Sequence, residues 1–196
     1  MFENIRADTM RVHRRKDPLR VIDVLHLLWE YYGLRALVIY RFGRWLGSIR
    51  KQPFGWAVAA PFYPAYWILS TFVNKAYGIN LEQNADIGAG LYIGHYGGIE
   101  VRNCRIGPYC SIQQQVKLGA AAAKGPVIGG RVWIGAHSRI CGDINVGDGA
   151  TIAAGTVIVQ DVPHHCLALG NPSRIAQRNY DNRAILWGPS PAMFDP

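Results

Sequence analysis

The segment Gly94-His95-Tyr96-Gly97-Gly98 contains the residue best suited to acid–base chemistry in this chain. Imidazole titrates near neutral pH, so His95 could take a proton from a weak acid such as an alcohol. A single histidine is more often structural than catalytic. The glycines on both sides favour the catalytic interpretation, and His95 is therefore a candidate general base whose role depends on the fold around it.

The other histidines and the cysteines do not suggest a second site. The histidines do not supply three converging zinc ligands, so no metal is predicted. They are His13, His26, His137, His164 and His165. The cysteines form no CxxC pair, and no secretory signal peptide begins the chain, which favours a reducing cytoplasm. They are Cys104, Cys110, Cys141 and Cys166.

A period of six residues from about Ile79 to Gln160 is the strongest pattern in the chain. Large aliphatic residues recur at Leu81, Ile87, Ile93, Ile99, Ile106, Ile112, Leu118, Ile128, Ile134, Ile140, Val146, Ile152 and Ile158. Neither a helical period of 3.6 nor an alternation of two gives this spacing, whereas short strands that bend every six residues do. The pattern predicts a β-solenoid over residues 79–175, in which stacked coils bury the aliphatic residues.

The period breaks twice. Ile99 to Ile106 is seven residues, which predicts a one-residue slip just after His95. Leu118 to Ile128 is ten residues, which predicts a loop of small residues over 119–127. Loops inserted in a solenoid tend to lie on its functional face, although a tolerated insertion would look the same.

Positive charge is concentrated before the solenoid. Of the formal charge of +8, residues 1–20 carry +3 and residues 21–78 carry +4, against +1 for 79–175 and zero for the tail 176–196. Such a distribution suits nucleic acid, an anionic membrane or a partner subunit. No nucleic-acid-binding motif accompanies it, so nucleic acid is not predicted.

The N-terminal part divides into a basic segment, residues 1–20, which we expect to be flexible, and a helical, aromatic-rich segment, residues 21–78. One or two helices are expected over 21–46, broken near Gly33. Residues 52–73 have no charge, but Pro61 and Pro64 would break a spanning helix. An interfacial membrane segment and packing on the solenoid or on a neighbouring subunit both remain open.

Four segments in order resemble the serine O-acetyltransferase-like group of the hexapeptide-repeat acyltransferases, and within it the polysaccharide O-acetyltransferase branch. They are residues 92–99, 114–119, the loop, and 161–175. The resemblance implies a mainly β chain, a left-handed parallel β-helix with an N-terminal α-helical segment. It also implies a homotrimer that binds acetyl-CoA in the groove between adjacent coils.

The resemblance assigns the general base to His95. Family members carry aspartates at the places of Asn80 and Gly94, and a second histidine near Gly125 or Pro126, so the groups that recognise free serine are largely missing here. Asn80, Glu100 or a backbone carbonyl could orient His95 instead.

The acyl-donor half of the site matches the family better. Small residues that would line the pantetheine arm are Gly119, Ala120, Ala136 and Ala154, and cations that could meet the phosphates are Lys124 and Arg174.

The sequence therefore predicts an acetyl-CoA-dependent O-acetyltransferase that acts on a hydroxyl of a sugar or glycan. It would be cytoplasmic, with possible peripheral contact between residues 1–78 and the inner face of the membrane. Two alternatives stay open, a serine O-acetyltransferase of cysteine biosynthesis and a solenoid scaffold without catalytic activity.

Overall fold

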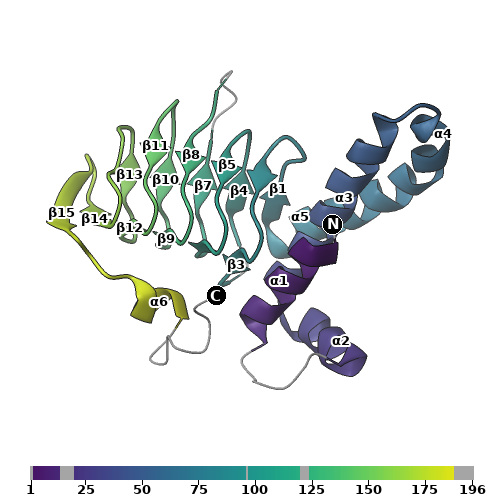
Figure 1. Ribbon diagram of the computed structural model, residues 1–196, viewed down its shortest axis with the longest axis horizontal. Coiled ribbons are helices and arrows are strands. Elements are labelled where there is room, and N and C mark those ends of the chain that lie inside the picture. Colours follow the sequence, from purple (N-terminus) through teal and green to yellow (C-terminus); the bar gives the residue numbers. More distant parts are fainter. Residues whose placement is uncertain (1, 14–19, 96, 120–123, 188–196) are drawn as a thin grey trace.

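The computed structural model describes residues 2–13, 20–95, 97–119 and 124–187. Helices come first along the chain and short strands follow (Figure 1). The helices are α1 (Phe2–Val12), α2 (Val21–Glu30), α3 (Tyr32–Arg50), α4 (Gly55–Ala59), the 3-10 helix η1 (Ala60–Phe62), α5 (Tyr63–Tyr77) and α6 (Arg183–Trp187). The strands are β1 (Ile79–Leu81), β2 (Asp86–Ile87), β3 (Tyr92–Ile93), β4 (Ile99–Val101), β5 (Arg105–Ile106), β6 (Ser111–Ile112), β7 (Lys117–Leu118), β8 (Val127–Ile128), β9 (Trp133–Ile134), β10 (Arg139–Ile140), β11 (Asn145–Val146), β12 (Thr151–Ile152), β13 (Val157–Ile158), β14 (Cys166–Leu169) and β15 (Arg174–Arg178).

The strands form three sheets, because every third strand pairs in parallel with its counterpart on the next coil. The first sheet has the order β1-β4-β7-β10-β13, the second β11-β8-β5-β2, and the third β15-β14-β12-β9-β6-β3, in which only the pair β14–β15 is antiparallel. The aliphatic residues of the sixfold pattern fill the interior of the coils. The structure thus confirms the predicted parallel β-helix and the helical segment that precedes it.

Turns between the sheets stack into three edges. The His95 edge joins the third sheet to the first at residues 94–98, 113–116, 135–138 and 153–156. The loop edge joins the first sheet to the second and includes residues 82–85, 102–104 and 141–144. The tail edge joins the second sheet to the third at residues 88–91, 107–110, 129–132 and 147–150.

The register of the first coil differs from the sequence prediction. Ile93 pairs with Ile112, but Val101, not Ile99, pairs with Leu118. Val101 therefore follows Ile93 by eight residues on the first coil, whereas Leu118 follows Ile112 by six on the second. The turn that contains His95 thus has two extra residues. The chain recovers the register with a shorter turn before Ile106. The sixfold period in the sequence placed the slip after His95. It could not distinguish Ile99 from Val101, because both are apolar and both are buried.

Part of the basic N-terminus, Phe2–Val12, forms helix α1 and packs against the first coil. Asp8 is buried, and its carboxylate accepts hydrogen bonds from the backbone N–H groups of Gly90 (2.8 Å) and Leu91 (3.1 Å) and from Arg41 Nε (3.0 Å). Arg41 also donates to the carbonyl of Gly88 (2.5 Å). These polar groups satisfy backbone atoms of the first coil that would otherwise be left unpaired at the end of the solenoid.

Helices α3, α4 and α5 form a hairpin that projects from this end of the solenoid (Figure 1). The predicted break near Gly33 lies instead at Tyr31, between α2 and α3, and Gly33 is helical. Pro61 and Pro64 stand at the starts of η1 and α5, where a missing N–H costs nothing. Within the described parts of the chain, none of the helices combines the length and the apolar character that crossing a bilayer requires.

Candidate active site

His95 is exposed on the turn that carries the two extra residues. Neighbours on both sides hold the backbone of this turn. The N–H of Gly97 donates to the carbonyl of Tyr77 at the end of α5 (2.8 Å), and the carbonyl of Gly97 accepts from the N–H of Gln115 on the next coil (2.9 Å). The fold therefore presents His95 to solvent on a backbone that is fixed at both ends.

Two glutamines, Gln113 and Gln115, pack under this turn. A Cβ at Gly94 would lie 2.5 Å from Oε1 of Gln113, which is the movable end of that side chain, and Gly98 has φ +66° with Gln115 packed against it. Backbone conformation therefore favours glycine at Gly98. The run Gln113-Gln114-Gln115 is visible in the sequence, but only the true register shows that it underlies the His95 turn.

Asn80 and Glu100 lie on the first sheet and are paired directly in register. Glu100 Oε1 lies 3.2 Å from Lys117 Nζ, and its Oε2 lies 3.4 Å from Arg102 Nη2. Among the described residues no hydrogen bond joins His95 to Asn80 or Glu100. The structure therefore places both near the beginning of the solenoid with His95, but it gives Glu100 two cationic partners of its own.

Three of the predicted acyl-donor residues lie on the His95 edge. Backbone hydrogen bonds connect successive turns of this edge, the last from the N–H of Gly155 to the carbonyl of Ala136 (2.7 Å). Coils stack about 4.8 Å apart, so Ala136 and Ala154 lie roughly 10 and 14 Å along the edge from the His95 turn. Arg174 pairs with Leu169 on the last coil and is exposed there. The candidate base His95, two small residues and a cation thus follow one another along one edge.

The remaining acyl-donor residues lie across the first sheet, on the loop edge. Gly119 directly follows β7 with φ +78°, and a Cβ there would overlap the carbonyl oxygen of Arg102. Lys124 is exposed and lies 3.6 Å from the carboxylate of Asp143. Ala120 falls outside the described residues. The acyl-donor residues on the His95 edge and those on the loop edge therefore do not share a pocket within one chain.

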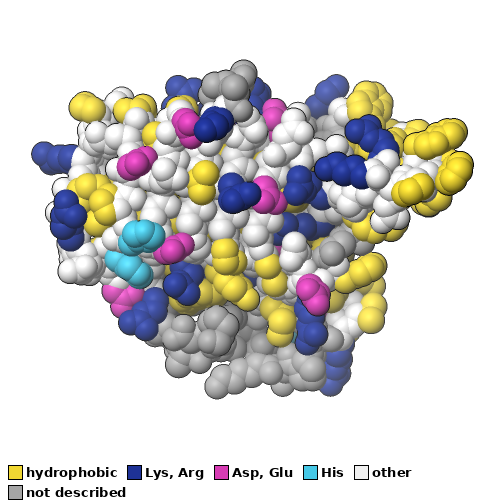
Figure 2. Space-filling model, turned by 45° about the horizontal axis from the view of Figure 1, so that its top comes forward, with side chains coloured by type: hydrophobic (Ala, Val, Ile, Leu, Met, Phe, Trp, Pro, Cys, Tyr) yellow, Lys and Arg dark blue, Asp and Glu magenta, His cyan; other side chains and the backbone are white. Residues whose placement is uncertain are grey.

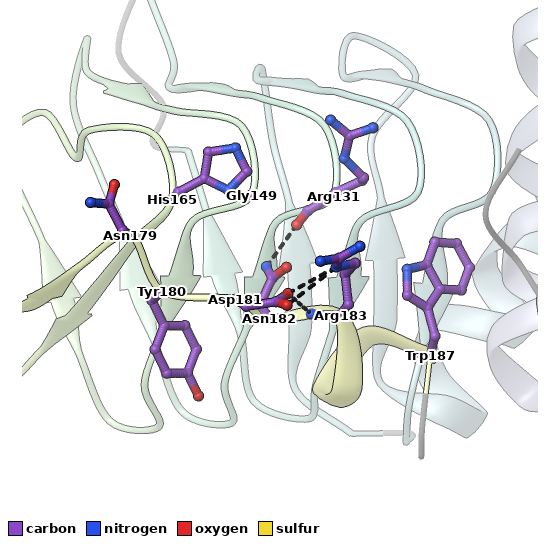
Figure 3. A pocket seen from close by; sticks show the side chains of 9 residues that line it. All are labelled: Arg131, Gly149, His165, Asn179, Tyr180, Asp181, Asn182, Arg183 and Trp187. Carbon is purple, nitrogen blue, oxygen red and sulfur yellow. Dashed lines mark hydrogen bonds and ion pairs between the residues drawn. The ribbon is translucent and has the colours of Figure 1, made fainter. Parts of the chain in front are cut away.

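A cavity of about 420 Å³ lies elsewhere, between the tail edge and the C-terminal residues (Figure 3). Arg131 and His165 line one side and Arg183 and Trp187 the other. The side chain of Asn182 donates to the carbonyl of Arg131 (2.9 Å) and ties the C-terminal residues to the solenoid. None of the predicted site residues lines this cavity, so it is separate from the His95 edge.

Helices from the two ends of the chain meet beside this cavity. The guanidinium carbon of Arg11 lies 3.4 Å from the centre of the Trp187 ring, and Arg11 also donates to the hydroxyl of Ser111 (3.1 Å). Burial lowers the pKa of Arg11 to about 10. One of the N-terminal cations, Arg11, is thus buried against Trp187 and Ser111.

No cluster of three or more His, Cys, Asp or Glu side chains is arranged to hold a metal ion in residues 2–13, 20–95, 97–119 and 124–187.

Comparison with known families matches residues 125–160 to the bacterial transferase hexapeptide model (six repeats) and residues 70–95 to the hexapeptide repeat of succinyl-transferase. The chain is 30% identical to the serine acetyltransferase of Synechococcus elongatus over 184 residues, which cover 91% of this chain and 70% of that protein. The chain therefore belongs to the hexapeptide-repeat acyltransferase family, and its relatives there are serine acetyltransferases.

Other relatives agree on the family. The serine acetyltransferase of Escherichia coli K12 is 36% identical over 148 residues, which cover 73% of this chain and half of that enzyme. The serine acetyltransferase structure from Vibrio cholerae has a TM-score of 0.74 at 30% identity and covers 94% of this chain and 69% of its own. A serine acetyltransferase in complex with CoA has a TM-score of 0.71 at 27% identity and covers 88% of this chain and 68% of its own.

These relatives contradict the predicted sugar or glycan acceptor, because they are serine acetyltransferases. The prediction rested on Asn80 and Gly94, where the family carries aspartates, on the missing second histidine near Gly125 or Pro126, and on the basic, aromatic N-terminal segment. The structure supplies another reason for Asn80, because an aspartate there would stand directly beside the carboxylate of Glu100, which like-charge repulsion disfavours.

Proposed function

We propose that this chain transfers the acetyl group of acetyl-CoA to the hydroxyl of L-serine, with His95 as the general base. The observation that carries the proposal is the similarity to a serine acetyltransferase across 91% of the chain. The exposed position of His95 on a fixed turn supports the assignment of the base.

The chemistry requires a base because a neutral alcohol is a poor nucleophile. His95 would remove the hydroxyl proton while the oxygen attacks the thioester carbonyl. Collapse of the tetrahedral intermediate breaks the C–S bond, and the imidazolium returns the proton to the departing thiolate of CoA. The products are the acetyl ester and free CoA, and His95 ends in its starting protonation state.

Acetyl-CoA would lie along the His95 edge. Ala136 is half-buried and Ala154 is exposed, and their small side chains would let an extended arm approach the backbone at these two coils. Arg174 at the far end could bind phosphate groups, since its guanidinium is exposed and a planar fork of donors suits phosphate. The similar structure in complex with CoA supports this class of ligand.

The division of the predicted residues between two edges supports assembly into a homotrimer. Gly119 and Lys124 on the loop edge of one subunit could face the His95 edge of its neighbour, which would complete the acyl-donor site. Contact of residues 1–78 with the inner face of a membrane is a separate proposal, and it rests on the surface of the helical hairpin.

A thiol-release assay with purified protein, acetyl-CoA and L-serine tests the proposal, with D-serine and an acceptor-free reaction as controls. We expect release that depends on L-serine and yields O-acetylserine by mass spectrometry. CoA binding in calorimetry without serine-dependent release would overturn the acceptor. Failure to bind CoA at all would favour the scaffold alternative.

A further inference from the structure

The helical hairpin exposes an unusually apolar surface at the end of the molecule away from the solenoid. Eight large apolar side chains on it are each between 44% and 83% exposed. We call them the hairpin face; they are Phe54, Trp56, Val58, Phe62, Trp67, Ile68, Leu69 and Phe72. Figure 2 shows hydrophobic side chains gathered on this projecting end, with Lys and Arg side chains beside them.

Helix α5 is apolar on the side that packs on the protein and also on the side that is exposed. Its inner side packs toward α3 and includes Tyr66 and the buried Val73. A helix at a protein surface normally carries polar residues on the opposite side. Here Trp67, Ile68 and Phe72 occupy that side and are exposed. The outward side of α5 is therefore built to meet an apolar partner.

The charges around the hairpin face all have one sign. From residue 31 to residue 81 the sequence contains no Asp or Glu. Arg50, Lys51 and Lys75 are exposed, and the described residues offer none of the three an ion-pair partner. An anionic partner would complement them.

The combination of exposed tryptophans, aliphatic residues and unpaired cations selects a lipid surface over a second copy of the chain. A symmetric contact between two hairpin faces would bring three cations against three cations with no acidic residue to offset them. Tryptophan rings favour the headgroup zone of a bilayer, and nearby Lys and Arg are attracted to anionic lipids.

We propose that the hairpin face inserts into the interfacial layer of an anionic bilayer and holds the enzyme there as a peripheral protein. The helices lie on the membrane rather than cross it, consistent with their short lengths. The hairpin lies at the opposite end of the molecule from β14, β15 and α6 (Figure 1). The last coils of the solenoid, with Arg174, therefore stay in water, whereas the His95 turn lies on the first coil, next to the end of α5.

Vesicle flotation with the full chain tests the proposal, using phosphatidylcholine vesicles with and without phosphatidylglycerol. We expect wild type to float with the anionic vesicles, less with neutral ones, and less as salt is raised. Trp56→Ser with Trp67→Ser should abolish flotation. Trp29→Ser is the matched control, because Trp29 is more exposed than Trp56 and Trp67 but lies on α2 beside Glu30.

Arg50→Gln with Lys51→Gln isolates the electrostatic part, and each lost charge should weaken binding to anionic vesicles by roughly fivefold. Thermal unfolding and serine-dependent thiol release should match wild type in all these variants, since the side chains are exposed and none of them belongs to the proposed acetyl-transfer site. Wild type that stays with the unbound fraction would overturn the proposal. So would a drop in oligomer mass by light scattering in the double tryptophan variant without vesicle binding, which would identify a second copy as the occupant.

Discussion

Gly119→Ala and Gly155→Ala form a matched pair that tests the stacking of the coils. Both glycines have positive φ, +78° and +70°, so an alanine at either place adopts an unfavourable backbone conformation. They differ in their surroundings. A Cβ at Gly155 meets nothing within 4 Å, whereas at Gly119 it would overlap the carbonyl oxygen of Arg102 on the coil before.

The left-handed conformation costs an alanine about 1–2 kcal/mol, and the reduced freedom of the unfolded chain offsets about 0.4–1 kcal/mol. We therefore expect Gly155→Ala to lower the free energy of unfolding by about 1 kcal/mol. Gly119→Ala adds an overlap with backbone that cannot rotate away, worth about 1–3 kcal/mol more. The expected loss at Gly119 is about 3 kcal/mol in total.

Thermal unfolding followed by circular dichroism measures the difference. For a protein of this size, 1 kcal/mol corresponds to about 2–4 °C, so Tm should fall by about 3 °C in Gly155→Ala and by about 9 °C in Gly119→Ala. Equal losses in the two variants would refute the placement of the Arg102 carbonyl under Gly119. Because Gly119 is also a proposed acyl-donor residue, CoA binding should fall in this variant as well.

Three further predictions concern the site and the thiols. Asn80→Asp should move the acidic limb of the kcat/KM profile to higher pH, because a nearby carboxylate stabilises protonated His95; an unchanged profile would show that position 80 does not act on the base. Arg174→Gln should weaken CoA binding by about tenfold and leave binding of pantetheine, which lacks the nucleotide phosphates, unchanged; equal losses for both would contradict a phosphate role. Burial raises the pKa of Cys110 to about 12, so in native protein Cys141, which is half-buried, should react with a thiol reagent far faster, and fast labelling of Cys110 on a peptide map would contradict its placement.

The solenoid could be predicted from sequence because a stacked coil repeats one requirement every six residues. Each buried aliphatic has to meet the one on the next coil, and Ile87, Ile106 and Ile128 do so in register. The position of the slip could not be predicted the same way. Ile99 and Val101 are both apolar, and only strand pairing shows which of them continues the column.

Candidate site residues could be named from the sequence, but their arrangement in space could not. The glycines around His95 marked the turn, yet nothing in the spacing shows that Gln113 lies against Gly94. Interpreting Asn80 and Gly94 as lost serine-binding groups contributed to the predicted sugar or glycan acceptor, which the serine acetyltransferase relatives contradict. The helix α1 could not be predicted from the sequence for a related reason, because Asp8 and Arg41 are charged residues that the fold buries as a pair.

The most direct test of the central claim is kcat for thiol release with L-serine in wild type and His95→Asn, at saturating acetyl-CoA. A general base contributes about 10²–10⁴ in rate, so kcat should fall by that factor. The Kd for CoA and the Tm should stay at the wild-type values, because His95 is exposed and has no described hydrogen-bond partner. A variant that releases thiol at close to the wild-type rate would contradict the assignment of His95 as the base.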